Sequence, residues 1–196
     1  MHPQLAAVVS DLESASARLR QLDASLTDLA WCMRPSPGRW SAAECVAHLN
    51  LTSHALLPLF RKAIADARAL RTTAPRRYRR NVLGWLASKI VAPGGGLKTR
   101  TLPAFVPTPV PPVADLINDF NRLQAEIVAC VREADGLPLE RVTVRSPFHG
   151  RMVYNVYAAF TLVPRHQHRH LLQAEQAALS CAPQAAAAAV KTTAAV

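Results

Sequence analysis

The sequence lacks any uninterrupted apolar run of about 18 residues, the length at which a helix becomes a candidate for crossing a membrane. Its start carries His2, Pro3, Asp11 and Glu13 rather than a basic segment that leads into an apolar one, so we expect no secretory signal. Cysteine is scarce too: the four residues are widely spaced, and none belongs to a CxxC pair. These absences predict a soluble, cytoplasmic protein with reduced thiols and no membrane partner.

Acidic residues are also few, with 13 Asp and Glu against 23 Lys and Arg, and the formal net charge is +10. No Asp or Glu occurs between Asp66 and Asp115. Eight of the 23 basic residues lie in this interval beyond Arg68: Arg71, Arg76, Arg77, Arg79, Arg80, Lys89, Lys98 and Arg100. The positive field is therefore local, and it favours an anionic ligand. We rank a nucleic-acid partner lowest, because the interval contains no recognisable nucleic-acid-binding motif.

Apolar residues at three- and four-residue steps predict four long amphipathic helices. They span about residues 4–30, 41–70, 113–134 and 152–180. The second begins at a capping box, in which Ser41 accepts the amide of Glu44 and the Glu44 side chain reaches back. Pro58 lies inside this helix and Pro164 inside the fourth, and each should bend its helix by removing a backbone hydrogen bond.

No segment shows a convincing alternating strand pattern, so the predicted fold class is all-α, a four-helix bundle in one domain. A long basic crossover or lid, residues 72–112, joins the second helix to the third and contains a possible short helix over residues 82–91. A connection of this length permits those two helices to run parallel, which favours an up-down-down-up order. The bundle domain then covers residues 1–181, and the Ala- and Thr-rich residues 182–196 form a disordered tail.

Histidine spacing is the most informative chemical pattern in the sequence. His166 and His170 are four residues apart, so they lie on one helical face and can direct nitrogens at a common point. His168 lies between them and points away. A third ligand must come from another helix, and His48 is best placed because it follows the packed start of the second helix. Three neutral nitrogens with an open position suit a divalent ion, zinc or nickel above others.

Each of these residues also has an ordinary structural explanation. Histidine pairs with this spacing occur on basic helix surfaces without binding metal, and we expect His54, His149 and His168 to be surface residues. Glu44 is first a capping residue; orienting His48 or acting as a catalytic base is its weaker alternative. Cys45 has no cationic neighbour in sequence that would indicate a thiolate, so we interpret it as a small buried residue.

Two segments resemble the helix signatures of the DinB-like, damage-inducible superfamily. Trp40-Ser41-Ala-Ala-Glu44-Cys-Val-Ala-His48-Leu49 is similar to its helix-two signature, and His166-Gln-His-Arg-His170-Leu-Leu-Gln173 is similar to its helix-four signature. Both occur in the family's order, with Ser146-Pro-Phe before the last helix, and the resemblance covers about residues 4–178. It implies the same bundle, frequent homodimers, and a metal held by His48, His166 and His170. The long basic crossover and Pro164 depart from the pattern.

The resemblance also implies an activity, because family members with assigned roles are metal-dependent thiol S-transferases or isomerases. A metal with an open position lowers the pKa of a bound low-molecular-weight thiol or water. The crossover would dock an anionic thiol or an electrophilic substrate through Arg76, Arg77, Arg79 and Arg80, although such a charge run is also typical of a solvated surface. Two alternatives stay open: a metal-stabilised interaction module without turnover, and a nucleic-acid binder that stacks bases on Tyr78 and Trp85.

Overall fold

The structure is a computed structural model that describes residues 1–92 and 101–193, with side chains described as far as Ala182. Its elements are α1 (Pro3–Ser25), α2 (Asp28–Cys32), α3 (Ala42–Ala69), α4 (Val82–Ile90), the 3-10 turn η1 (Pro103–Phe105), α5 (Val113–Glu133), β1 (Thr143–Arg145), β2 (Val153–Asn155) and α6 (Val156–Thr193). The predicted helical class is confirmed, with one small sheet added. In the part of the chain that is described, no helix is long and apolar enough to span a bilayer.

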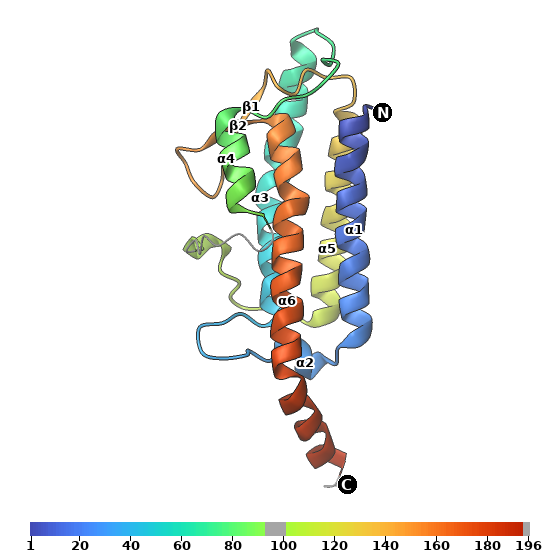
Figure 1. Ribbon diagram of the computed structural model, residues 1–196, viewed down its shortest axis with the longest axis vertical. Coiled ribbons are helices and arrows are strands. Elements are labelled where there is room, and N and C mark those ends of the chain that lie inside the picture. The colour runs from blue at the N-terminus through green and yellow to red at the C-terminus, as the bar shows by residue number, and fades with distance from the viewer. Residues whose placement is uncertain (93–100, 194–196) are drawn as a thin grey trace.

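Four long helices lie side by side and form the body of the molecule (Figure 1). α3 packs against α5 and α6, and α1 packs against the same two helices. Figure 1 shows α1 and α6 running away from the end marked N, while α3 and α5 run toward it. α3 and α6, which carry the histidines of interest, are therefore antiparallel neighbours. The connection from α3 to α5 includes α4 and η1, and residues 93–100 of the predicted crossover lie outside the described residues.

The start of α3 follows the predicted capping box. The Ser41 hydroxyl accepts the Glu44 amide at 3.2 Å, and the Glu44 carboxylate accepts the Ser41 amide at 2.8 Å. Because both orphan amides are satisfied, the helix start is stabilised and residues 42–50 can all be buried. Pro58 lies inside α3 with its side chain exposed. The helix therefore tolerates the proline and continues to Ala69.

The first predicted helix, residues 4–30, is in fact two helices. α1 ends at Ser25, and α2 begins at Asp28. Thr27 lies between them with an extended backbone, and its hydroxyl accepts the Ala30 amide at 3.3 Å. A threonine side chain that caps a new helix competes with continuation of the old one. The leucine spacing continues across this break, which is why the periodicity concealed it.

A short β-hairpin that no sequence pattern predicted precedes α6. β1 and β2 pair antiparallel, with Val144 opposite Tyr154. Each strand has three residues, too few for an alternating pattern to be recognised. Asn155 ends β2 and caps α6, since its side-chain oxygen accepts the Ala158 amide at 2.9 Å. The last helix therefore begins at Val156 rather than near residue 152.

The far end of α6 also differs from the expectation. The sequence predicted that the last helix ends near Ser180 and that residues 182–196 form a disordered tail, whereas helical backbone continues to Thr193. Alanine has the highest intrinsic helix propensity, and residues 185–189 are all alanine. Local propensity thus accounts for helical backbone past Ser180; residues 194–196 of the predicted tail lie outside the described residues.

Candidate metal centre

Three histidines from two helices meet inside the bundle. His48 lies on the second turn of α3 and is buried, and His166 and His170 lie one turn apart on α6 and are half-buried. One ligating nitrogen from each lies within 4.8 Å of the other two. The ring centroid of His170 is 4.6 Å from that of His48 and 4.6 Å from that of His166. Within the described residues, this is the one group of three or more His, Cys, Asp or Glu close enough to share an ion.

Hydrogen bonds orient two of the three rings. The Nδ1 atom of His48 lies 2.8 Å from the Phe105 carbonyl oxygen, and Nδ1 of His170 lies 3.1 Å from Oε1 of Gln173. Since a carbonyl oxygen only accepts, we infer that each Nδ1 carries the hydrogen and donates it. The lone pair of each ring is then on Nε2, and Nε2 of His48 lies 3.4 Å from Nε2 of His166. This is the tautomer that a metal-ligating histidine adopts when its other nitrogen donates.

The electrostatic surroundings keep the histidines neutral. Burial lowers the pKa of His48, although the hydrogen bond to Phe105 acts in the opposite direction. Burial, followed by the nearby His48 and Arg169, lowers the pKa of His170 to about 3. The pKa of His166 also lies well below its usual value, again through burial first and neighbouring charges second. At neutral pH all three rings therefore keep their lone pairs, which is the form that binds a metal.

The spacing of the nitrogens fits a tetrahedral ion. Two nitrogens that each lie about 2.1 Å from a tetrahedral metal are roughly 3.4 Å apart. The two Nε2 atoms of His48 and His166 have that separation, at 3.4 Å. His166 and His170 lie one turn apart on α6, and together with His48 on α3 they supply three nitrogens. The remaining coordination positions of the ion are left to other ligands. The donor set and the geometry therefore fit a divalent cation.

Aromatic rings flank the three histidines. The ring of Trp40 lies 5.0 Å from that of His48 and 6.0 Å from that of His170, measured between centroids. Phe148, from the loop between β1 and β2, lies 6.2 Å from His166 and 4.7 Å from Phe105. These rings exclude water from the sides of the cluster and strengthen electrostatic interactions inside it. Phe105 carries no sequence signal for this position, because it lies in a connecting segment. Phe148 belongs to the Ser146-Pro-Phe segment of the family resemblance, which did not place its ring beside the histidines.

Glu44 is held in the capping role rather than directed at the histidines. One carboxylate oxygen accepts the Ser41 amide, and the Arg34 guanidinium pairs with both oxygens, with Nε at 2.9 Å from Oε2. Burial raises the pKa of Glu44, but Arg34 and Ser41 together lower it below its ordinary value. The partner that orients His48 is the carbonyl of Phe105. Sequence could not identify this partner, because every residue has a carbonyl.

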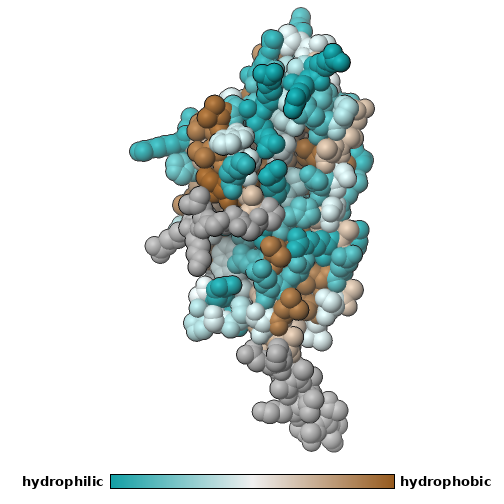
Figure 2. Space-filling view, viewed as in Figure 1, coloured by the Kyte–Doolittle hydropathy of each residue, from teal (hydrophilic) through white to brown (hydrophobic). Residues whose placement is uncertain are grey.

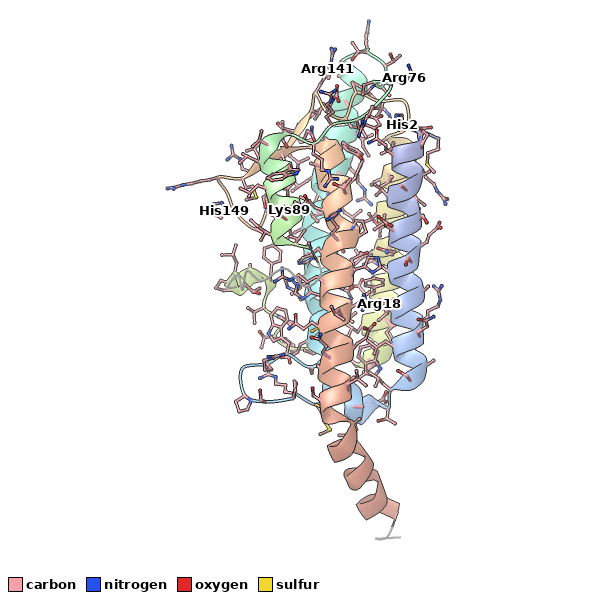
Figure 3. The ribbon with its side chains drawn as sticks, in the orientation of Figure 1. His2, Arg18, Arg76, Lys89, Arg141 and His149 are labelled. Carbon is pink, nitrogen blue, oxygen red and sulfur yellow. The ribbon has the colours of Figure 1, made fainter. Side chains whose placement is uncertain are left out.

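The other histidines lie away from the cluster. Nε2 of His168 lies 3.3 Å from the Asp11 carbonyl on α1, and His54 pairs with Asp119 at 3.2 Å on α5. His149 is exposed in the loop between the two strands, as Figure 3 shows. Cys45 is buried beside the helix start, and burial raises its pKa to about 12. A thiol with that pKa is not a nucleophile at neutral pH.

The four crossover arginines lie at another level of the bundle. Arg76, Arg77 and Arg79 are exposed, and Figure 3 places Arg76 near His2, at the end where α1 begins. The Arg79 carbonyl accepts the Asn155 side chain at 2.8 Å, just before the start of α6. His166 comes eleven residues after Asn155, which corresponds to about 16 Å of helix. The structure does not bring Arg76, Arg77 or Arg79 to the histidines, whereas Arg80 lines a pocket with Asp11, Thr161 and Arg165.

Four long packed helices around a buried three-histidine cluster define a class of helical bundle that can hold a metal ion. In a comparison with family models, the model of the DinB superfamily matches residues 11–174, which is most of the chain. The protein belongs to the DinB superfamily. No curated protein and no solved structure matches it.

Proposed function

We propose that the protein binds one divalent metal ion, zinc or nickel, through Nε2 of His48, His166 and His170. The observation that carries this proposal is the convergence of three neutral imidazoles within 4.8 Å, two of them with Nδ1 engaged by an oxygen acceptor. Three buried cationic rings would repel one another, so neutrality is also what makes the cluster compatible with folding. A bound cation would then stabilise the folded state by mass action.

We further propose that the site serves a thiol S-transferase-like reaction on a small molecule. A metal with an open position activates a low-molecular-weight thiol or a water by lowering its pKa. The chain's own residues orient and shield this site: Phe105 fixes the ring of His48, while Trp40 and Phe148 flank the cluster. Cys45 is the cysteine nearest in sequence to a ligand, and its raised pKa makes it unsuitable as the nucleophile. We therefore assign the reactive thiol to a small molecule rather than to Cys45.

The test combines elemental analysis with an activity screen. Protein purified without a histidine tag should contain about one equivalent of metal per chain, as a single three-histidine site predicts. The loaded protein is then assayed with small thiols against electrophiles such as epoxides and alkyl halides, with the chelated protein as control. Thiol consumption that requires the metal supports the transferase proposal. Stoichiometric metal without turnover of any pair would instead favour the interaction module.

The second candidate, a metal-stabilised interaction module, uses the same three ligands. In that case metal removal would lower the melting temperature, and no substrate would be consumed. A homodimer is compatible with either function and stays a prediction. Nucleic-acid binding ranks below both, since phosphate contacts by the basic crossover alone would give weak, sequence-blind and strongly salt-dependent association.

A further inference from the structure

The short helix α4 turns its large apolar side chains away from the protein. Gly84, Ala87 and Ser88 are buried on the side that faces the bundle, where α4 packs against α6 and β2. The opposite side is apolar and exposed: Val82 at 80%, Trp85 at 55% and Leu86 at 44% of the fully exposed area. Leu83, at 39%, extends the same surface. We call the surface formed by Val82, Leu83, Trp85 and Leu86 the α4 face.

This orientation is fixed by close packing. A Cβ atom at Gly84 would lie 2.4 Å from the Cβ of Ala158, so no larger residue fits at this contact. Asn81 caps α4 by accepting the Gly84 amide at 3.1 Å, and its Nδ2 donates to the Val153 carbonyl at 3.2 Å. Rotation of α4 to bury Trp85 would force an indole into the space that glycine occupies. The close packing at Gly84 therefore fixes the α4 face on the outer side of the helix.

The surroundings of the α4 face are basic. No Asp or Glu occurs in residues 67–114 or 141–174, the segments that supply α4, β2 and the part of α6 that follows β2. The ammonium of Lys89 lies 5.6 Å from the Trp85 ring centroid, on the exposed side. Arg79 and Arg80 precede the helix. Glu140, one of four acidic residues that border these segments, accepts the Arg79 amide, and Arg80 lines a pocket with Asp11. Figure 2 shows hydrophobic surface where Figure 1 places α4, beside hydrophilic side chains.

We propose that the α4 face docks the protein on the surface of an anionic phospholipid bilayer. Exposed tryptophan and aliphatic side chains enter the boundary between headgroups and acyl chains, and neighbouring Lys and Arg pair with lipid phosphates. A second copy of the chain is disfavoured, because its identical face would bring like charges together. Nucleic acid has phosphates for Lys89 but no apolar surface for Val82 and Leu86. This proposal departs from the sequence-based expectation of no membrane partner, and it does not depend on the three-histidine site.

The experiment measures co-sedimentation of the full chain with vesicles of phosphatidylglycerol and phosphatidylcholine, and with vesicles of phosphatidylcholine alone. The test variant is Trp85→Ser with Leu86→Ser, and its matched control is Leu29→Ser with Leu179→Ser. The control residues are apolar groups on α2 and α6 that are also exposed, at 47% and 74% against 55% and 44% for Trp85 and Leu86. A charge variant, Lys89→Glu, is compared with Arg20→Glu on α1. Circular dichroism verifies that every variant is folded.

The proposal predicts binding to the anionic vesicles only, and loss of at least tenfold in affinity for the Trp85/Leu86 variant. The Lys89→Glu variant should bind the anionic vesicles about tenfold or more weakly than the wild type, since each basic residue near an anionic surface strengthens binding about fivefold. Both controls should bind as the wild type does. No binding to anionic vesicles, or equal binding by the Trp85/Leu86 variant and its control, overturns the proposal. A dimer in sedimentation velocity that the Trp85/Leu86 variant abolishes, or duplex DNA binding tighter than vesicle binding, also overturns it.

Discussion

Nδ1 of His48 lies 2.8 Å from the carbonyl oxygen of Phe105, a residue 57 positions later in the chain. This contact connects the crossover segment to the three-histidine cluster. The crossover therefore has a role in the candidate site that is independent of its charge, because it fixes the ring of His48 through the backbone. The basic side chains at Arg76 and Arg77 lie elsewhere and need not take part.

We expect Gly84→Ala to destabilise the protein, because the new methyl group would overlap Ala158 and the Asn81 side chain. Overpacking of this kind costs about 1–3 kcal/mol in the free energy of unfolding. Urea denaturation measures the change. Gly150→Ala is the matched control, since nothing lies within 4 Å of the position that its new methyl group would take, and it should be close to neutral. A stable Gly84→Ala variant would show that α4 does not pack as described.

The buried amides of Gln124 and Gln167 should be energetically coupled. Nε2 of Gln167 donates to Gln124 at 2.7 Å, and Nε2 of Gln124 donates to Gln167 at 3.1 Å and to the Leu12 carbonyl at 2.6 Å. Gln124→Leu leaves the Gln167 amide unsatisfied and should cost about 1–3 kcal/mol. The double variant to leucine should cost less than the sum of the single ones. Additive losses in a double-mutant cycle would contradict the coupling.

Glu44→Gln should reduce stability at neutral pH and make no difference in strong acid. The folded pKa of Glu44 is lowered, so its ionised form stabilises the protein above the ordinary pKa of 4.5. That contribution is lost as the pH falls through the lowered folded value. Glutamine keeps an acceptor for Ser41 but loses the ion pair with the exposed Arg34, so the loss in stability should be small. Denaturation at pH 7 and in acid checks this.

The same variant tests a catalytic role for Glu44. Its carboxylate belongs to the capping box and is not one of the converging groups, so we expect unchanged metal content and unchanged activity. Loss of turnover with full metal content and unchanged stability would show that Glu44 acts in the reaction.

The Arg76→Ala, Arg77→Ala double variant tests the predicted docking of an anionic thiol. Figure 3 places Arg76 near the start of α1. If these arginines dock an anionic thiol, a long thiol whose anionic group is far from its sulfur should show a raised apparent KM in the variant, whereas a short thiol should not. Metal content should not change. If the variant and the wild type have the same KM for the long thiol, these arginines are not part of the binding site.

Hydrophobic periodicity and capping residues predicted the helices well where packing follows the local sequence pattern. The box at Ser41 and Glu44 placed the start of α3 correctly, and the spacing of His166 and His170 placed both on one face. What sequence missed depends on contacts between distant segments. The Phe105 carbonyl, the ring of Phe148 and the close approach of Gly84 to Ala158 each involve residues without a local pattern. The break at Thr27 was hidden because leucine spacing continues through it.

Metal content of four single variants tests the central claim most directly. His48→Ala, His166→Ala and His170→Ala should each lower metal affinity by more than about 100-fold, beyond the effect expected from loss of an outer hydrogen-bond partner. His168→Ala should retain wild-type content, because its ring is directed at Asp11 on α1. Elemental analysis of untagged protein measures all four. Full metal in every variant, or metal lost in His168→Ala and retained in His166→Ala, would contradict the account.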